Sequence, residues 1–215
     1  MNKKTVNCID FILNLVILLS TIWAVGYYFV GGPDVLGSTG TGCFKYFTTD
    51  SNVLVALTAA VLLFFNIRRF KNPDAPIPKW AMILKFTGTV SVTITLLTVV
   101  FFLAPTSYLK GGWESFLFFF KDNIFALHLS TPVIAIIALI FFEKEPKFRF
   151  RDCLWGLLPT VIYSVVYLVL VVFVKIWTDW YGFTFGGKLF MIPVSIIAMY
   201  LVTLLVSWVL HLLRK

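Results

Sequence analysis

The sequence predicts an all-α integral membrane protein, a six-helix bundle in which both termini lie in the cytoplasm. Two observations carry this prediction: six long apolar runs, and an unequal distribution of Lys and Arg among the gaps between them. Composition agrees, because 60% of the residues are hydrophobic, only 13% are charged and the mean hydropathy is +0.93. Such a composition excludes a soluble domain with a water-facing surface.

Each apolar run is close to the roughly 20 residues that a helix needs to cross the hydrocarbon core. The first run is too long for the core of a signal peptide, so it is expected to remain as a span. The gaps are short, and the whole chain, 1–215, is therefore expected to form a single six-span transmembrane domain in the cell membrane. The runs lie near residues 8–30, 49–67, 80–103, 124–142, 154–174 and 189–211.

Cationic residues fall mainly in the gaps that an even-numbered topology places on the side of the termini. Because positive loops stay in the cytoplasm, both ends of the chain are predicted to be cytoplasmic, and a bacterial inner or plasma membrane fits this pattern. Lys85, inside the third run, is expected to extend to the nearby interface. The favoured gaps hold Lys3, Lys4, Arg68, Arg69, Lys71, Lys79, Lys144, Lys147, Arg149, Arg151, Arg214 and Lys215, whereas the others hold Lys45, Lys110, Lys121, Lys175 and Lys188.

The third run alone offers an argument for a transmembrane β-barrel, because hydroxyl residues alternate with mostly apolar neighbours from Thr87 to Thr95. The other runs are almost continuously apolar, which favours helices. In a helix these hydroxyls can bond to carbonyls of their own helix or to neighbouring helices. Hydroxyls on two sides of one helix predict a central position in the bundle.

No motif indicates a metal site or a bound cofactor, and none is expected. HExxH, CxxC, GxSxG and the phosphate-binding loop are all missing from the sequence. The net charge of +8 is interpreted as an orientation signal that favours anionic lipid headgroups, and no nucleic-acid-binding module is found. Membrane lipids are therefore the expected partners.

Polar residues at the outer ends of the second and fourth runs form two groups at similar depth. Thr48, Ser51 and Asn52 share one helical face, since they are spaced i, i+3 and i+4. His128 lies about one turn below the start of the fourth span. The two groups can share a pocket if their helices are neighbours.

His128 is the candidate functional residue of the fourth span, because an ionisable group inside a membrane is costly. Pro132 lacks the N–H that would bond to the carbonyl of residue 128, so the helix is predicted to loosen at the histidine. The alternative is a neutral histidine that only packs against a facing hydroxyl.

Several short motifs resemble the family of androgen-induced protein and androgen-dependent TFPI-regulating protein, and its bacterial relatives in particular. They are the stretch from Tyr46 to Asn52, the histidine near the start of the fourth span, and a fifth span with Pro159, Tyr163 and Tyr167 that leads into Trp180-Tyr181-Gly182-Phe183. The resemblance covers the layout of the whole chain. The stretch around His128 departs from the family pattern beyond the histidine and a downstream proline.

The resemblance implies an intramembrane hydrolase for fatty acid esters of hydroxy fatty acids, with Thr48 as the nucleophile and His128 as the base. Thr49 is a neighbouring hydroxyl, so the nucleophile could be displaced by one residue. A base beside the hydroxyl fits the chemistry, since threonine is a weak nucleophile at neutral pH. Asn52 is the expected oxyanion donor. Asp50, Asn123, Asp122 and above all Asp179 are candidates to orient the base, although each acid could simply be a solvated loop carboxylate.

The sequence leaves two alternatives open. The chain could be a non-enzymatic membrane protein, such as a small transporter or a lipid-binding or assembly factor, although Pro132, Pro159 and Pro193 do not show the inverted-repeat spacing of many transporters. An acyltransferase would use the same Thr48 and His128 pair but exclude water.

Overall fold

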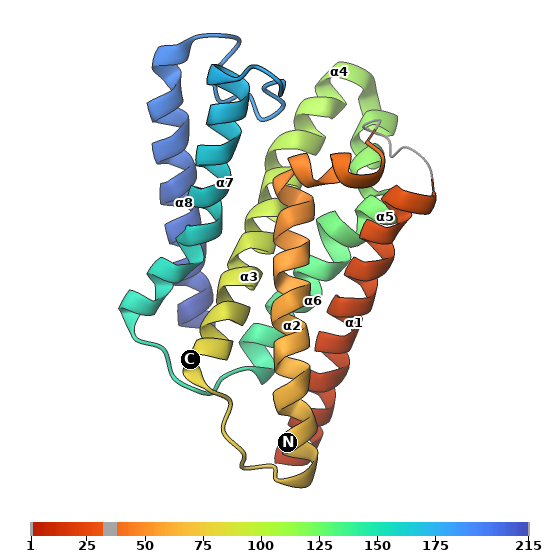
Figure 1. Ribbon diagram of the computed structural model, residues 1–215, viewed down its shortest axis with the longest axis vertical. Coiled ribbons are helices and arrows are strands. Elements are labelled where there is room, and N and C mark those ends of the chain that lie inside the picture. Colours follow the sequence, from red (N-terminus) through yellow and green to blue (C-terminus); the bar gives the residue numbers. More distant parts are fainter. Residues whose placement is uncertain (1, 32–37, 215) are drawn as a thin grey trace.

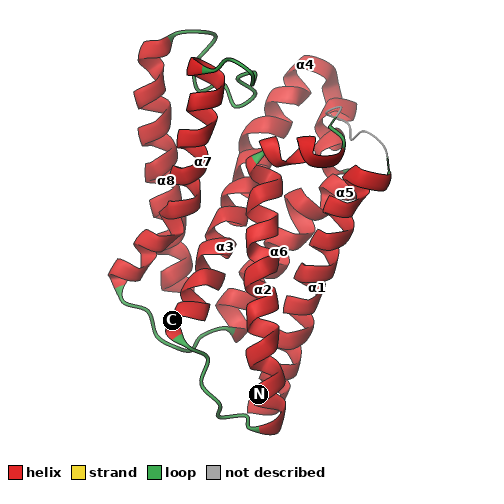
Figure 2. Cartoon of the chain, in the orientation of Figure 1, coloured by secondary structure: helices red, strands yellow, loops and turns green. Residues whose placement is uncertain are grey.

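The computed structural model describes residues 2–31 and 38–214 of the chain, and these residues form helices and loops without any strand (Figure 2). Six helical stretches are long and apolar enough to cross a membrane, and they match the six runs that the sequence predicts. A helix satisfies its own backbone hydrogen bonds, which is why apolar runs of this length become helices in lipid. The stretches are Lys3–Val30, Phe47–Lys71, Lys79–Phe120, Asp122–Phe142, Phe150–Phe173 and Leu189–Leu213.

The six stretches divide into regular helices and short π-helical or 3-10 turns (Figure 1). The first two are the uninterrupted helices α1, Lys3–Val30, and α2, Phe47–Lys71. The third joins α3, Lys79–Thr98, through a π-helical turn at Val99–Leu103 to α4, Ala104–Leu117. The remaining three contain α5, Asp122–Phe125, with α6, Thr131–Ile137, then α7, Leu158–Leu168, and finally α8, Ile192–Leu213.

The third stretch runs further than the predicted span, which ends near residue 103. Helical structure continues to Phe120, with non-helical backbone only at Gly111 and Gly112, where the φ of Gly112 is +69°. The helix can continue beyond the apolar run because helical hydrogen bonding does not require apolar side chains. A glycine fits the break, since positive φ carries no side-chain penalty there.

Helix α3 occupies the centre of the bundle, as the hydroxyl pattern predicts. Figure 1 shows α7 and α8 on one side of it and α1, α2 and α6 on the other, and α3 packs against α2, α6, α7 and α8. Its hydroxyls bond back to carbonyls one turn earlier: Thr89 to Lys85, Ser91 to Thr87 and Thr93 to Thr89. Water is therefore not needed to satisfy these groups.

Lys85 does not reach the interface, and the expectation that it would is wrong. Its side chain is 0% exposed and lies 3.6 Å from the carboxylate of Glu143, which is equally buried. The amine also donates to Asn14 Oδ1 at 2.7 Å. A local partner satisfies the ammonium more completely than a long reach to the membrane surface does.

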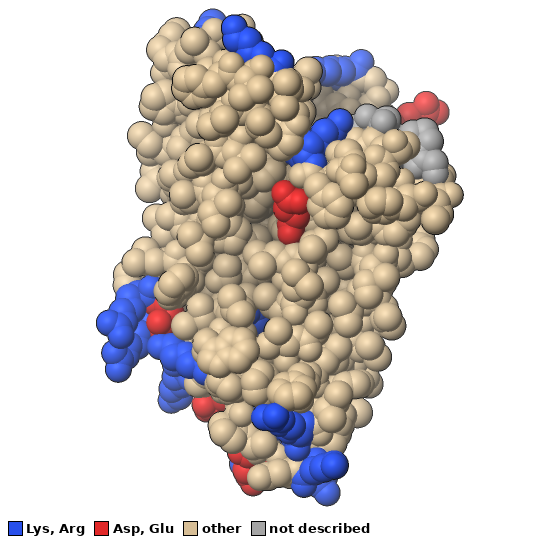
Figure 3. Space-filling view, in the orientation of Figure 1, with Lys and Arg blue, Asp and Glu red and all other residues tan. Residues whose placement is uncertain are grey.

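Both ends of the described chain lie at the same end of the bundle, as six spans require (Figure 1). We call this the terminal end; the opposite end holds the start of α2 and the loop between α7 and α8. On the face in Figure 3, charged side chains gather mainly at the two ends, and a band with few charges separates them. Such a band is what a membrane-spanning surface presents to lipid.

Gly88 allows α2 and α3 to pack closely. A Cβ at this position would lie 2.9 Å from the Val55 Cα and 3.1 Å from the Thr58 hydroxyl, closer than side-chain carbons approach backbone. Small residues commonly permit this approach between membrane helices.

We predict that Gly88→Ala lowers the unfolding free energy by about 1–3 kcal/mol, because the two helices must separate to admit the methyl group. The measurement is the thermal midpoint of the purified protein in detergent. Gly26→Ala is the matched control, since no atom lies within 4 Å of the added methyl group there. Equal midpoints for the two variants would contradict the close packing.

Candidate functional site

A largely apolar cavity of about 650 Å³ lies at the opposite end of the bundle, where the α7 and α8 pair meets α2 and α3. Its volume is within the roughly 300–1,000 Å³ of typical small-molecule sites. Residues from α2, from α3 with its π-helical turn, from α7, from α8 and from the loop before α8 form the wall: Phe47, Thr48, Ile94, Thr95, Thr98, Val99, Phe102, Leu103, Thr160, Tyr163, Tyr181, Gly182, Phe183, Phe185, Ser195, Ala198, Met199 and Val202.

Thr48 lies in the first turn of α2 and lines this cavity. Its carbonyl accepts hydrogen bonds from Asn52 Nδ2 at 2.7 Å and from Ser51 Oγ at 3.1 Å, so the turn that carries the hydroxyl is held from within the helix. Thr49 is only 1% exposed and is not part of the cavity wall. Of the two neighbouring hydroxyl residues, Thr48 is therefore the one that faces the space.

His128 lies in a π-helical turn, Ala126–Ser130, directly before α6. The prediction that Pro132 loosens the helix at the histidine is confirmed by this turn, because a proline cannot continue the regular hydrogen-bond pattern. The ring is 5% exposed and packs against the ring of Phe119, with 6.0 Å between the ring centroids.

The Nδ1 atom of His128 lies 2.8 Å from the carbonyl oxygen of Phe119. A carbonyl oxygen only accepts, so Nδ1 carries the hydrogen and donates it. In the neutral ring the lone pair is then on Nε2. A backbone carbonyl thus fixes the tautomer and orientation of the imidazole, a role for which the sequence offers only side chains, those of Asp50, Asp122, Asn123 and Asp179.

Asn52 joins the segment of Thr48 to the segment of His128. Its Nδ2 donates to the Thr48 carbonyl and also to the Leu127 carbonyl at 2.9 Å, and the side chain is fully buried. Both hydrogens of the amide are occupied by these carbonyls. In this arrangement Asn52 positions two helices, and an oxyanion donor has to come from another residue.

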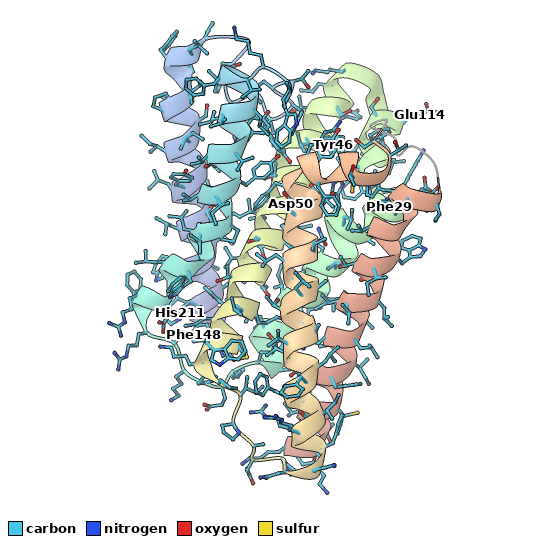
Figure 4. The ribbon with its side chains drawn as sticks, in the orientation of Figure 1. Phe29, Tyr46, Asp50, Glu114, Phe148 and His211 are labelled. Atoms are coloured by element: carbon cyan, nitrogen blue, oxygen red, sulfur yellow. The ribbon has the colours of Figure 1, made fainter. Side chains whose placement is uncertain are left out.

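Two further candidates, Asn123 on α5 and Asp50 on α2, have local roles. Asn123 Nδ2 donates to the Ala24 carbonyl at 3.0 Å and so ties α5 to α1. Asp50 lies in the first turn of α2, beside Tyr46 in Figure 4, where a carboxylate complements the helix dipole.

Asp179 organises the loop between α7 and α8. Its carboxylate accepts hydrogen bonds from the Tyr167 hydroxyl at 2.9 Å, the Phe183 N–H at 2.9 Å, and both the N–H and the hydroxyl of Thr184 at 2.7 and 2.6 Å. Burial acts to raise the pKa of Asp179, but these hydrogen bonds outweigh it and hold the pKa below the ordinary value of a carboxyl.

A second, smaller cavity of about 370 Å³ lies next to the first. Phe119, whose carbonyl holds His128, and Asp179 both line it. It shares Phe102, Leu103, Tyr181 and Gly182 with the larger cavity of Thr48, and these shared residues form the boundary between the two spaces. Thr48 and Phe119, the hydrogen-bond partner of His128, therefore line neighbouring cavities, whereas His128 itself lines neither of the two.

The motifs from distant parts of the sequence meet at this boundary. The Tyr46 and Trp180 rings contact edge to face with centroids 5.2 Å apart, and Phe47 and Tyr163 lie 5.1 Å apart. The Tyr181 hydroxyl accepts the N–H of Phe47 at 3.2 Å. Tyr181 thus binds the start of α2 next to Thr48, a contact that the pattern of aromatic residues alone does not reveal.

Comparisons with protein-family models, with curated proteins and with solved structures find no match for this chain. A function for this chain therefore has to be inferred from the geometry of the site.

We predict that Asp179→Asn destabilises the protein by about 1–2 kcal/mol at neutral pH, because an amide nitrogen faces donors that the carboxylate satisfies. A carboxyl with a lowered pKa in the folded state stabilises above the unfolded value near 3.9, and loses this effect as the pH falls through the folded value. The difference in thermal midpoint from wild type should accordingly shrink in acid, below about pH 4.

The matched control for that measurement is Glu114→Gln, which changes an exposed carboxylate at the same end of the bundle (Figure 4). Its midpoint should follow wild type at every pH. A difference between Asp179→Asn and wild type that stays constant from neutral pH into acid would contradict the assigned hydrogen bonding.

Proposed function

We propose that this chain is an integral membrane hydrolase of lipid esters, of the type of fatty acid esters of hydroxy fatty acids, in which Thr48 is the nucleophile and His128 the general base. The single observation that carries the proposal is the hydrogen bond from His128 Nδ1 to the Phe119 carbonyl. It leaves the basic lone pair on Nε2, as a general base at a hydroxyl nucleophile requires.

The cavity supports a lipid substrate. Its wall is largely apolar and comes mainly from the membrane-spanning helices, and Thr48 is one of the residues that line it. An acyl chain fits such a space because burial of its methylene groups is favourable, at about 0.8 kcal/mol for each. The ester group would then lie in the part of the cavity that Thr48 and Tyr181 line.

Under this proposal the reaction has two steps, transfer of the acyl group to Thr48 and its hydrolysis. The Thr48 oxygen attacks the ester carbonyl while Nε2 of His128 accepts the hydroxyl proton, and the alcohol leaves with that proton. An acyl group is now bound to Thr48. Water attacks this second ester, His128 again accepts and returns a proton, and the fatty acid is released.

Tyr181 is the proposed oxyanion donor, in place of Asn52. Tyr181 lines the same cavity as Thr48, and its hydroxyl accepts the N–H of Phe47, the residue before Thr48. Burial raises the pKa of Tyr181 to about 12, so the phenol keeps its hydrogen at neutral pH. A donor that is fixed before the reaction stabilises the developing charge without reorganisation.

We predict that a lipophilic fluorophosphonate labels the wild-type protein, with the Thr48 oxygen bonding to phosphorus as fluoride leaves. Thr48→Ala should abolish the label, Thr48→Ser should retain it, and His128→Ala should slow labelling by about 10²–10⁴-fold, the usual worth of a general base. Labelling is followed by gel fluorescence and by mass spectrometry of the modified peptide.

Thr49→Ala is the matched control, because it removes a hydroxyl from the same helical turn but not from the cavity wall. It should label like wild type. Persistent labelling of both Thr48→Ala and His128→Ala would exclude this pair, and a folded wild type without any label would favour a non-enzymatic lipid-binding protein. Product formed with an added alcohol in place of water would indicate an acyltransferase.

We also predict that Tyr181→Phe lowers kcat for a chromogenic fatty acyl ester by about 10²-fold or more, with KM nearly unchanged, since the donor acts mainly on the transition state. Tyr163→Phe is the control: its hydroxyl donates to the Lys45 carbonyl and equally supports the start of α2. Equal losses of kcat in both variants would assign Tyr181 a purely structural role.

A further inference from the structure

A cluster of buried polar and ionisable side chains lies inside the bundle, in the half nearer the terminal end. Asp10 and Asn14 come from α1, Asn66 from α2, Lys85 from α3, and Glu143 from the residue directly after the fourth stretch. None of the five is more than 2% exposed. The site described above does not use them, and ionisable groups in a membrane-spanning region generally serve a function.

Asn14 is the central residue of the cluster. Its Oδ1 accepts from Lys85 Nζ at 2.7 Å, whereas its Nδ2 lies 2.9 Å from Asp10 Oδ1 and 3.0 Å from Glu143 Oε1. Asn66 Nδ2 donates to the second Asp10 oxygen at 2.9 Å. The two carboxyl groups thus meet at one amide nitrogen.

The hydrogen bonds around that nitrogen lack a donor. Asn14 Nδ2 has two hydrogens, but a third acceptor, the Asp10 backbone carbonyl, also lies 3.0 Å from it. Glu143 Oε2 is buried and, among the described residues, has no hydrogen-bond partner. One additional hydrogen on a carboxyl oxygen would supply the missing donor, and buried polar groups are costly without such a partner.

The charges lead to the same conclusion. Lys85, 3.6 Å from Glu143, is the only cation within ion-pair distance of either carboxylate in the described chain. Arg69 and Arg214 also lie near the two carboxyl groups, but their guanidinium groups donate to backbone carbonyls, those of Ala75 for Arg69 and of Glu143 and Pro146 for Arg214. Two like charges in contact at low dielectric favour binding of one proton.

We propose that Asp10 and Glu143 hold one exchangeable proton between them, so that the bundle contains a proton-binding site near its terminal end. The proton comes from water at that end and forms an O–H bond on one carboxyl oxygen, with no other bond made or broken. Its loss leaves two adjacent carboxylates, which weakens the network that joins α1, α2, α3 and the end of the fourth stretch. The packing of this end therefore responds to pH.

The direction of the pH effect is set by the number of protons that each state binds. At neutral pH the folded protein holds a proton that the two carboxyls of the unfolded chain, with ordinary pKa values near 4, have released. The folded state binds more protons, so its stability falls as the pH rises from about 4 to the pH at which the folded site empties. Over that range the unfolding equilibrium constant should rise about tenfold for each pH unit, and above it the constant should level off.

We expect Asp10→Asn and Glu143→Gln to remove this dependence, because an amide is uncharged and itself provides a donor. The measurement is the thermal midpoint of full-length protein in lipid nanodiscs from about pH 6 to about pH 10. Asp74→Asn is the matched control, since Asp74 is an exposed carboxylate that pairs with Lys3 on the surface of the same end. It should keep the wild-type slope.

Infrared spectroscopy of the wild type gives a second readout that needs no variant to fold. A protonated carboxyl has a carbonyl band that shifts when aspartate or glutamate is labelled with carbon-13, and this band should disappear at high pH. Identical pH slopes in wild type, Asp10→Asn and Glu143→Gln, or no such band at neutral pH, would overturn the proposal. So would stabilisation by sodium over choline at constant pH that Asp10→Asn abolishes, because the cluster would then be a metal cation site.

Discussion

Polar groups in the membrane-spanning part of this chain must find partners within the protein, because the hydrocarbon core offers no water. Three buried asparagines show how this constraint shapes the bundle. Asn52 reaches the carbonyl of Leu127, Asn123 reaches that of Ala24, and Asn14 joins Asp10, Lys85 and Glu143. Each amide ties one helix to another, so satisfying the side chain and positioning the helices are the same event.

The two ends of the bundle use polar groups differently. At the opposite end, hydroxyl and aromatic residues border an apolar cavity, and Thr48 has space in front of it. At the terminal end, the side chains of the network around Asn14 are buried, at most 2% exposed. Space is needed for a substrate that enters and leaves, whereas a proton needs only a hydrogen-bond acceptor. This difference between the two ends is the basis of the two proposals, lipid-ester chemistry at the opposite end and a response to pH at the terminal end.

Much of the fold could be predicted from single residues and their spacing. The six spans, the central position of the hydroxyl-rich helix and the loosened helix before Pro132 all have local causes, and all are confirmed. The prediction that Lys85 extends to the interface is wrong because the ammonium finds hydrogen-bonding partners inside the bundle. Its partners Asn14 and Glu143 lie 71 residues before it and 58 after it in the sequence.

The sequence by itself determined the helical class, the number of spans and the placement of both termini at one end of the bundle, because these depend on the hydropathy of each segment. Tertiary structure alone decided that His128 bonds to the Phe119 carbonyl and that Asn52 donates both amide hydrogens to backbone carbonyls. It also decided that the Asp179 carboxylate accepts hydrogen bonds from its own loop. The physical reason is that a hydrogen bond between helices depends on how each helix is rotated and shifted against its neighbour. Packing across the whole bundle sets that rotation, and no single segment encodes it.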